Sequence, residues 1–115
     1  MGLVILKDLP ELEIAPGIKG RAVTSDTMTI MHVTIEKDAN LPKHSHYHEQ
    51  VVNVVEGELE LVLEGVPHLL NSGNSLVIPP NAVHWGKAKT AVKVVDVFHP
   101  IRQDFAGKSF GGYNK

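Results

Sequence analysis

Short runs of apolar and β-branched residues, separated by glycine, proline and asparagine, constrain the fold of this chain most strongly. Residues 58–64 are the clearest example, because leucine occupies positions 59, 61 and 63 while glutamate occupies positions 58, 60 and 64. Successive side chains of a strand point to opposite faces, so the leucines share one face and the glutamates the other. The pattern predicts a half-buried strand of an antiparallel sheet.

Five further runs are typical of strands, and no segment has clear helical periodicity. They span residues 28–36, 50–55, 68–70, 76–78 and 92–98. The apolar phase slips within residues 28–36, so either both faces of that strand are partly buried or a bulge lies near Ile30. Gly57 indicates a bend or bulge just before the leucine strand. The sequence therefore predicts an all-β sandwich or barrel.

The size and composition of the chain restrict its organisation and its partners. The 115 residues, 43% of them hydrophobic, suit one domain over residues 1–115, with a core of about 20–100 and a loose tail at 106–115. A net charge of −2 without a basic patch argues against nucleic acid as a partner. The absence of cysteine excludes disulfides and thiolate ligands. No apolar run is long enough to span a membrane and no signal peptide is evident, so we expect no membrane partner and a cytoplasmic location.

Residues 44–50, with the sequence His-Ser-His-Tyr-His-Glu-Gln, concentrate potential metal ligands. Imidazole is the commonest protein ligand of divalent transition metals. His44 and His46 lie two residues apart, so an extended chain directs both to one face. A straight strand would carry Gln50 roughly 13 Å beyond His46, so it reaches the same ion only if the chain bends near residues 47–48. A surface cluster of histidines is the alternative interpretation.

A fourth ligand must come from elsewhere, and His84 is the best candidate because it follows a loop, residues 79–83, that enters a strand. Three neutral imidazoles and one amide oxygen would leave the full double positive charge on one bound divalent ion. This donor set suits Ni, Mn, Fe, Co or Zn alike. Within the histidine-rich stretch, we expect His48 to be a loop residue rather than part of the pocket edge, and Glu49 to be solvated or paired.

The spacing of these residues resembles the first motif of the cupins, His-x-His, three or four residues, Glu, six residues, Gly. His44, His46, Gln50 and Gly57 fit that spacing, with glutamine in place of glutamate. The resemblance, which covers roughly residues 20–100, implies an antiparallel double-stranded β-helix, the jelly-roll cupin barrel. That fold agrees with the all-β prediction made from the strand patterns. Because many cupins dimerise, the resemblance also implies a homodimer.

The second cupin motif, Gly, five residues, Pro-x-Gly, two residues, His, three residues, Asn, is matched in part. Gly73, Pro79 and His84 lie at the motif spacing, while Asn81 and Ala88 replace its second glycine and its asparagine. Paired motifs at this separation are specific for the fold. They leave the activity open, because cupins include enzymes, sugar binders and storage proteins.

Asp96 is the notable acidic residue of the last strand, because Val94, Asp96 and Phe98 share one strand face. Two interpretations follow. Asp96 faces solvent while Val95 and Val97 fill the core, or Asp96 lies in the mouth of the barrel near the metal. In the second case a low dielectric and the ion would tune the carboxyl group for proton transfer.

Residues 96–105, together with the sequence His-Glu-Gln at 48–50, resemble the KdgF-type cupins, the pectin-degradation proteins. The resemblance implies ring opening of 4,5-unsaturated uronates, the small anionic sugars that pectin and alginate lyases release, to linear keto acids. Arg102 as a surface cation and Phe98 as ordinary core are the plain alternatives. The implied assignments are metal ligands His44, His46, Gln50 and His84, catalytic residues Asp96 and Arg102, and substrate-binding residues Phe98 and Arg102.

The replacement of glutamate by Gln50 bears on the reaction type. A neutral amide keeps the ion more electrophilic than a carboxylate would, which favours Lewis-acid chemistry on a carbonyl or hydroxyl over redox chemistry. Two other functions compete with uronate ring opening. One is a quercetinase-like cupin dioxygenase, which cleaves an enol with oxygen, and the other is a non-enzymatic cupin that binds a sugar or a metal.

Overall fold

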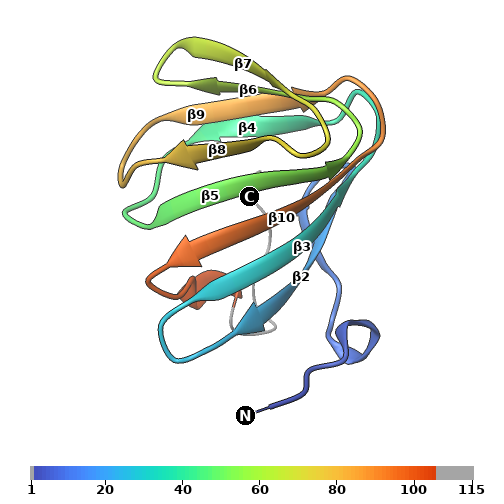
Figure 1. The fold of residues 1–115 in the computed structure, drawn as a ribbon, viewed down its shortest axis with the longest axis vertical. Coiled ribbons are helices and arrows are strands. Elements are labelled where there is room, and N and C mark those ends of the chain that lie inside the picture. The colour runs from blue at the N-terminus through green and yellow to red at the C-terminus, as the bar shows by residue number, and fades with distance from the viewer. Residues whose placement is uncertain (1, 106–115) are drawn as a thin grey trace.

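The computed structural model describes residues 2–105, which form two antiparallel sheets packed face to face (Figure 1). The six-stranded sheet has the order β1-β2-β3-β10-β5-β8 and the four-stranded sheet the order β4-β9-β6-β7. Between β4 and β10 the chain passes repeatedly from one sheet to the other, which is the predicted jelly roll. The strands are β1 (Leu12–Ala15), β2 (Ile18–Thr24), β3 (Thr29–Ile35), β4 (Asn40–His44), β5 (Glu49–Glu56), β6 (Leu59–Leu63), β7 (Val66–Leu70), β8 (Ser75–Ile78), β9 (His84–Ala88) and β10 (Val92–His99).

The helical structure of residues 2–105 is limited to two 3-10 turns, η1 (Leu6–Asp8) and η2 (Gln103–Phe105). None of the helices described is long and apolar enough to cross a membrane. The expected loose tail at residues 106–115 lies outside the described residues.

Side-chain alternation builds the core between the two sheets. Leu59 and Leu61 of β6 are buried while Glu60 between them points outward, as the sequence pattern predicted. In β3, alternate residues from Thr29 to Ile35 are buried without interruption, so no bulge lies near Ile30. The slip in apolar phase arises because the outward-facing Ile30 is itself half-buried, which is the first of the two interpretations.

Gly57 marks the point where the chain leaves the six-stranded sheet for the four-stranded one. The register between β10 and β5 shifts between Lys93 and Val94, so a bulge lies just before the turn, as predicted. Gly57 has φ +91°, a conformation that strains residues with a Cβ. A Cβ at this position would also collide with the main-chain carbonyl of Ala91. Gly57 is therefore required by both conformation and space.

We expect Gly57→Ala to destabilise the protein more than Gly65→Ala. Gly65 also has a positive φ, +80°, but a Cβ there meets no atom within 4 Å. Gly65→Ala should therefore cost only the conformational strain, about 1–2 kcal/mol, whereas Gly57→Ala adds the collision with Ala91, typically about 1–3 kcal/mol more. Urea unfolding of the two variants measures the difference. Equal losses of stability would contradict the crowding at Gly57.

Strand pairing gathers the predicted site residues at one end of the barrel. In the β4–β9 pair, His44 lies directly opposite His84. In the β5–β10 pair, Gln50 lies directly opposite Phe98. The chain bends at residues 47–48 as it passes from β4 to β5, which is the bend that the position of Gln50 required.

Candidate metal centre

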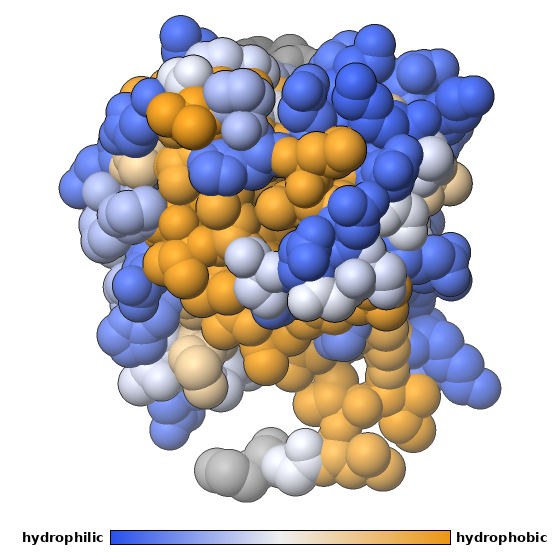
Figure 2. Space-filling model, turned by 45° about the horizontal axis from the view of Figure 1, so that its top comes forward, coloured by the Kyte–Doolittle hydropathy of each residue, from blue (hydrophilic) through white to orange (hydrophobic). Residues whose placement is uncertain are grey.

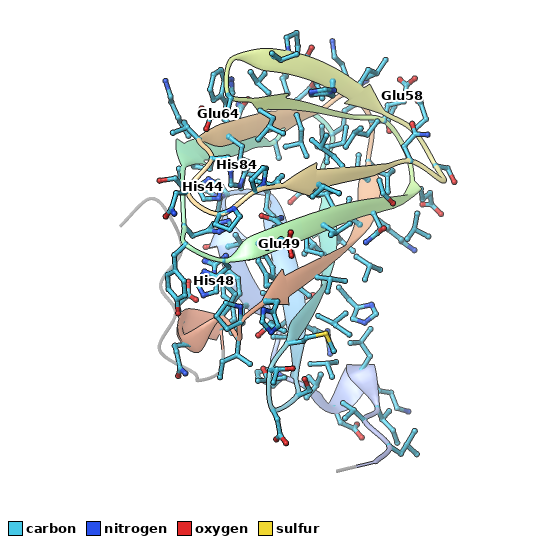
Figure 3. All side chains as sticks on the ribbon, turned by 60° about the vertical axis from the view of Figure 1, so that its left-hand side comes forward. His44, His48, Glu49, Glu58, Glu64 and His84 are labelled. Atoms are coloured by element: carbon cyan, nitrogen blue, oxygen red, sulfur yellow. The ribbon has the colours of Figure 1, made fainter. Side chains whose placement is uncertain are left out.

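Three histidines converge at this end of the barrel. His44 ends β4, His46 lies in the loop that follows, and His84 begins β9. One ring nitrogen from each lies within 4.8 Å of the other two. The rings of His44 and His84 are 4.2 Å apart between centroids, and Figure 3 shows these two side chains together at the barrel end. The structure thus brings together the three histidines that the sequence singled out.

Main-chain carbonyls fix the tautomers of His44 and His84. Nδ1 of His44 lies 2.7 Å from the carbonyl oxygen of Pro42, and Nδ1 of His84 lies 2.9 Å from that of Ala82. A carbonyl oxygen only accepts, so each Nδ1 carries the proton and each Nε2 keeps a lone pair. Nε2 of His84 is buried and has no hydrogen-bond partner within the described part of the chain. A metal ion can bind a buried nitrogen lone pair of this kind.

His46 and Gln50 also bring two hydrogen-bond acceptors together where a cation could bind. Nδ1 of His46 lies 3.1 Å from the carbonyl oxygen of His48, and its Nε2 lies 3.1 Å from Oε1 of Gln50. A neutral imidazole has one N–H, so it can donate to only one of these two acceptors. With the proton on Nδ1, as in the other two rings, the Nε2 lone pair and the amide oxygen face each other. A cation between them would resolve this clash, so Gln50 lies where it could supply a fourth metal ligand.

The protonation states of the histidines also suit a metal. Burial, with smaller contributions from neighbouring cationic groups, lowers the pKa of both His44 and His46 to about 4. Burial also lowers the pKa of His84, to which the charge of Arg102 adds. The three rings are therefore neutral near pH 7, and the neutral imidazole is the form that binds a metal. The residues present fit a divalent ion held by three Nε2 atoms and one amide oxygen.

Asp96 points into the barrel rather than toward solvent, so the solvent-facing interpretation is wrong. The neighbours Val95 and Val97 lie on the outer face of β10 and do not fill the core. Burial raises the pKa of Asp96 to about 7, while a hydrogen bond with Gln50 and the charge of Arg102 act in the opposite direction. Its Oδ1 atom is buried with no hydrogen-bond partner among residues 2–105. A carboxyl group with an unused oxygen thus lies beside Gln50.

A cavity of about 50 Å³ joins Asp96 to His44, Gln50 and His84. The walls of the cavity are aliphatic over most of their area, and its polar lining includes His44, Gln50, His84 and Asp96. Ligand pockets for drug-sized molecules are typically about 300–1,000 Å³. This cavity therefore admits the reacting end of a small ligand rather than a whole ligand.

Phe98 and Arg102 form one side of the site. Phe98 is buried, lines the cavity and lies 5.7 Å from His46 between ring centroids. Arg102 is only 3% exposed, so the surface-cation alternative is wrong. Its Nε and Nη2 atoms donate to the two carboxylate oxygens of Asp104 at 3.0 and 2.7 Å. Its guanidinium also packs on Phe98 and Phe105, 4.8 and 4.3 Å from their ring centroids.

His48 has a role that the sequence did not reveal. It lies in the loop between β4 and β5, as predicted, yet it is buried, and its Nε2 donates to the carbonyl oxygen of Ile101 at 3.1 Å. The main-chain N–H of Arg102 donates to Oγ1 of Thr29 at 2.9 Å. These two bonds tie the segment after β10 to the wall of the site. The adjacent Glu49 is exposed, in agreement with the solvated role expected for it.

Known proteins share this sequence and architecture. The family described as the cupin domain matches residues 31–98. The chain is 32% identical over 101 residues to the pectin degradation protein KdgF of Dickeya dadantii (strain 3937), an alignment that covers 85% of this chain and 92% of that protein.

Two solved structures are similar over nearly their whole length. An RmlC-like cupin from Shewanella frigidimarina superposes with a TM-score of 0.85 at 28% identity and covers 92% of this chain and 96% of its own. KdgF from Halomonas sp. superposes with a TM-score of 0.82 at 27% identity and covers 90% and 97%. Sequence and structure therefore point to the same group of proteins.

We expect one divalent ion per chain and a loss of at least 100-fold in affinity when His84 becomes alanine. The substitution removes a buried metal ligand whose ring is already oriented by its hydrogen bond to the main chain. His99→Ala is the matched control, because His99 ends β10 on the exposed side and should leave binding unchanged. Metal analysis and titration calorimetry with Ni²⁺ or Zn²⁺ measure both variants. Equal affinities for the two would contradict the assigned donors.

The metal-free protein should lose stability as the pH falls from about 6.5 to about 4. The pKa values of the site histidines are lowered in the folded state, so the unfolded chain binds their protons first and is favoured by acid. Asp96 acts in the opposite direction because its folded pKa is raised. The histidines outnumber Asp96, so their effect prevails. Asp96→Asn should make the loss of stability with falling pH steeper. Urea midpoints measured with a chelator test this, and a flat profile from pH 6.5 to 5 would contradict it.

Proposed function

The chain belongs to the cupin family, and from that premise we propose that it is a metal-dependent enzyme that opens the ring of 4,5-unsaturated uronates. One observation carries the proposal. Two members of a three-histidine cluster, His44 and His84, line one cavity together with Gln50 and the inward-facing Asp96. The similarity to two KdgF proteins, one of them described as a pectin degradation protein, supports a uronate as the substrate.

The proposed reaction is an isomerisation and needs no oxidant. In its ring form the substrate is a hemiacetal at C1 and an enol ether at C5. Ring opening breaks the bond between C1 and the ring oxygen while the C1 hydroxyl gives up its proton to a base, which leaves an aldehyde at C1 and an enolate at C5. The enolate then takes that proton back at C4 and becomes a ketone. The enzyme must therefore move protons and stabilise negative charge on oxygen.

The donor set suits the second of these tasks. A divalent ion held by His44, His46, His84 and Gln50 would act as a Lewis acid on a substrate oxygen. The four neutral donors leave the positive charge of the ion uncompensated by the protein. Main-chain carbonyls hold the donor rings of His44 and His84 in the required tautomer, so little reorganisation accompanies binding.

Asp96 suits the first task. Its buried Oδ1 atom has no hydrogen-bond partner within residues 2–105, and the residue lines the cavity beside Gln50. In the proposed reaction, Asp96 takes the proton of the C1 hydroxyl and returns a proton to C4. A single carboxyl group can serve both steps, because the reaction neither gains nor loses protons overall.

Phe98 and Arg102 would position the sugar. The Phe98 ring lines the cavity next to His46 and offers an apolar surface to one face of the substrate ring. The guanidinium of Arg102 binds a carboxylate through two parallel hydrogen bonds, and in the structure this carboxylate belongs to Asp104. We place the substrate carboxylate at the same guanidinium, where it would take the place of Asp104.

The test is to mix the metal-loaded protein with the unsaturated product of a pectate or alginate lyase and to follow the loss of enol-ether absorbance. The protein should accelerate the spontaneous rate, and Asp96→Asn should lower kcat at least 100-fold, the usual minimum contribution of a general acid–base group. His99→Ala should keep full activity. Metal analysis of Asp96→Asn confirms that the ion is still bound.

A spontaneous rate that the loaded protein leaves unchanged would exclude the proposed function. Oxygen consumption distinguishes the dioxygenase alternative. We expect none when the same protein is given a flavonol or a diketone. Rapid oxygen uptake with either compound would favour the dioxygenase instead.

A further inference from the structure

Arg102 is the one arginine or lysine that is buried within residues 2–105. The lysines of this range are all exposed and Arg21 is half-buried, whereas Arg102 is only 3% exposed. Figure 2 shows the usual arrangement on one face of the molecule, where hydrophilic side chains lie at the surface around a hydrophobic centre. Burial removes a cation from water, so a buried guanidinium needs an anion close to it. Asp104 supplies one here.

The ion pair between Arg102 and Asp104 is buried on one side only. Nε and Nη2 of Arg102 donate to the two carboxylate oxygens of Asp104 at 3.0 and 2.7 Å, so the carboxylate covers one edge of the guanidinium. The side chain of Arg102 is 4% exposed, whereas that of Asp104 is 39% exposed. Asp104 is therefore the solvent end of the pair, where rotation about its side-chain bonds can return the carboxylate to water.

The main chain at Arg102 is held by contacts that do not involve Asp104. The main-chain N–H of Arg102 donates to Oγ1 of Thr29 at 2.9 Å, and Nε2 of His48 donates to the carbonyl oxygen of Ile101 at 3.1 Å. These bonds join the segment to the start of β3 and to the loop between β4 and β5. A rotation of the Asp104 side chain therefore leaves the main chain at Arg102 in place.

Two aromatic rings hold the guanidinium itself and connect it to the candidate site. Its central carbon lies 4.8 Å from the ring centroid of Phe98 and 4.3 Å from that of Phe105. Both rings line the cavity, and the ring of Phe98 is 5.7 Å from that of His46 between centroids. A carboxylate that replaces Asp104 thus meets a guanidinium that is already oriented beside the aromatic wall of the site.

We propose that Asp104 is an internal competitor for the substrate carboxylate, a specificity-determining residue that keeps other small anions away from Arg102. The proposal rests on the proposed function, which places the substrate carboxylate at the same guanidinium. Asp104 is two residues from Arg102 in the chain, so its effective concentration there exceeds that of a small carboxylate in solution. A simple anion such as acetate therefore does not displace it. A uronate does, because its sugar oxygens make further contacts at the metal centre that offset the loss of the internal pair.

The first test compares Asp104→Asn with wild-type protein, both loaded with Zn²⁺, by titration calorimetry. Asparagine has the shape of aspartate without its charge, so a carboxylate from solution can take the edge of the guanidinium. The affinities for acetate and for D-galacturonate, a saturated uronate, should each rise roughly 10- to 100-fold, which corresponds to the usual strength of a hydrogen bond to a charged group. The affinity for D-galactose, which has a hydroxymethyl group in place of the carboxylate, should stay the same.

Asp38→Asn is the matched control. Asp38 is exposed in the turn between β3 and β4, at the end of the barrel away from the site, and its φ of +69° is one that asparagine also adopts. Its affinities should equal those of the wild type. Adding Arg102→Gln to Asp104→Asn should abolish the gain. Unchanged or weaker carboxylate binding by folded, Zn²⁺-loaded Asp104→Asn would overturn the proposal, and so would a gain that persists without Arg102.

A second test uses the wild-type protein and does not depend on a substitution. In Zn²⁺-loaded protein with ¹³C-labelled aspartate, the side-chain carboxyl signal of Asp104 reports whether the ion pair is formed. Excess D-galacturonate should move this signal to the position of a solvated carboxylate, while acetate at the same concentration should leave it unchanged. A signal that D-galacturonate does not move at any concentration would contradict displacement of Asp104.

These measurements are independent of the ring-opening assay, because neither acetate nor D-galacturonate contains the enol ether that the proposed reaction uses. If the loaded protein fails to accelerate ring opening while Asp104→Asn still binds carboxylates more tightly, the proposed function is wrong and the competition by Asp104 stands. If ring opening is confirmed but the carboxylate affinities of Asp104→Asn equal those of the wild type, the proposed function stands and the competition by Asp104 is wrong.

Discussion

The antiparallel register is the constraint on which the site depends. It sets His44 opposite His84 in one sheet and Gln50 opposite Phe98 in the other. A shift of one residue in either pair would turn its site residues from the cavity to the outer surface. The aliphatic core holds the register, because the same shift would expose buried residues of these strands, such as Ala88, Val52 and Val94. The strand register that packs the core is therefore also the register that assembles the site.

Within that frame, burial determines the electrostatics of the site. It keeps the imidazoles neutral, while the adjacent backbone carbonyls hold the His44 and His84 rings with Nε2 toward the shared centre. Nε2 of His84 is thus a buried acceptor that lacks a hydrogen-bond donor among the described residues, and a cation at the centre would satisfy it. The positive charge of Arg102, held by Asp104 and two aromatic rings, further disfavours protonation of the histidines. The local environment thus prepares the centre for a metal rather than for protons.

The strand β10 shows what pattern analysis could and could not predict. Period-two alternation placed Val94, Asp96 and Phe98 on one face, and the structure agrees. The sequence did not decide which face was inward, because Val95 and Val97 on the other side are equally apolar. The structure explains the ambiguity, since both faces of this strand are hydrophobic and only one covers the core.

The sequence by itself determined the all-β class, the family, the two motif spacings and the four candidate donors, because these depend on local periodicity and on residue type. Only the tertiary structure decided that Asp96 faces the cavity, that Arg102 is buried against Asp104, and that His48 holds the segment after β10. Those facts depend on contacts between residues far apart in the chain, such as His48 with Ile101. Local pattern carries no information about such contacts, because the register of the assembled sheets sets which distant residues meet.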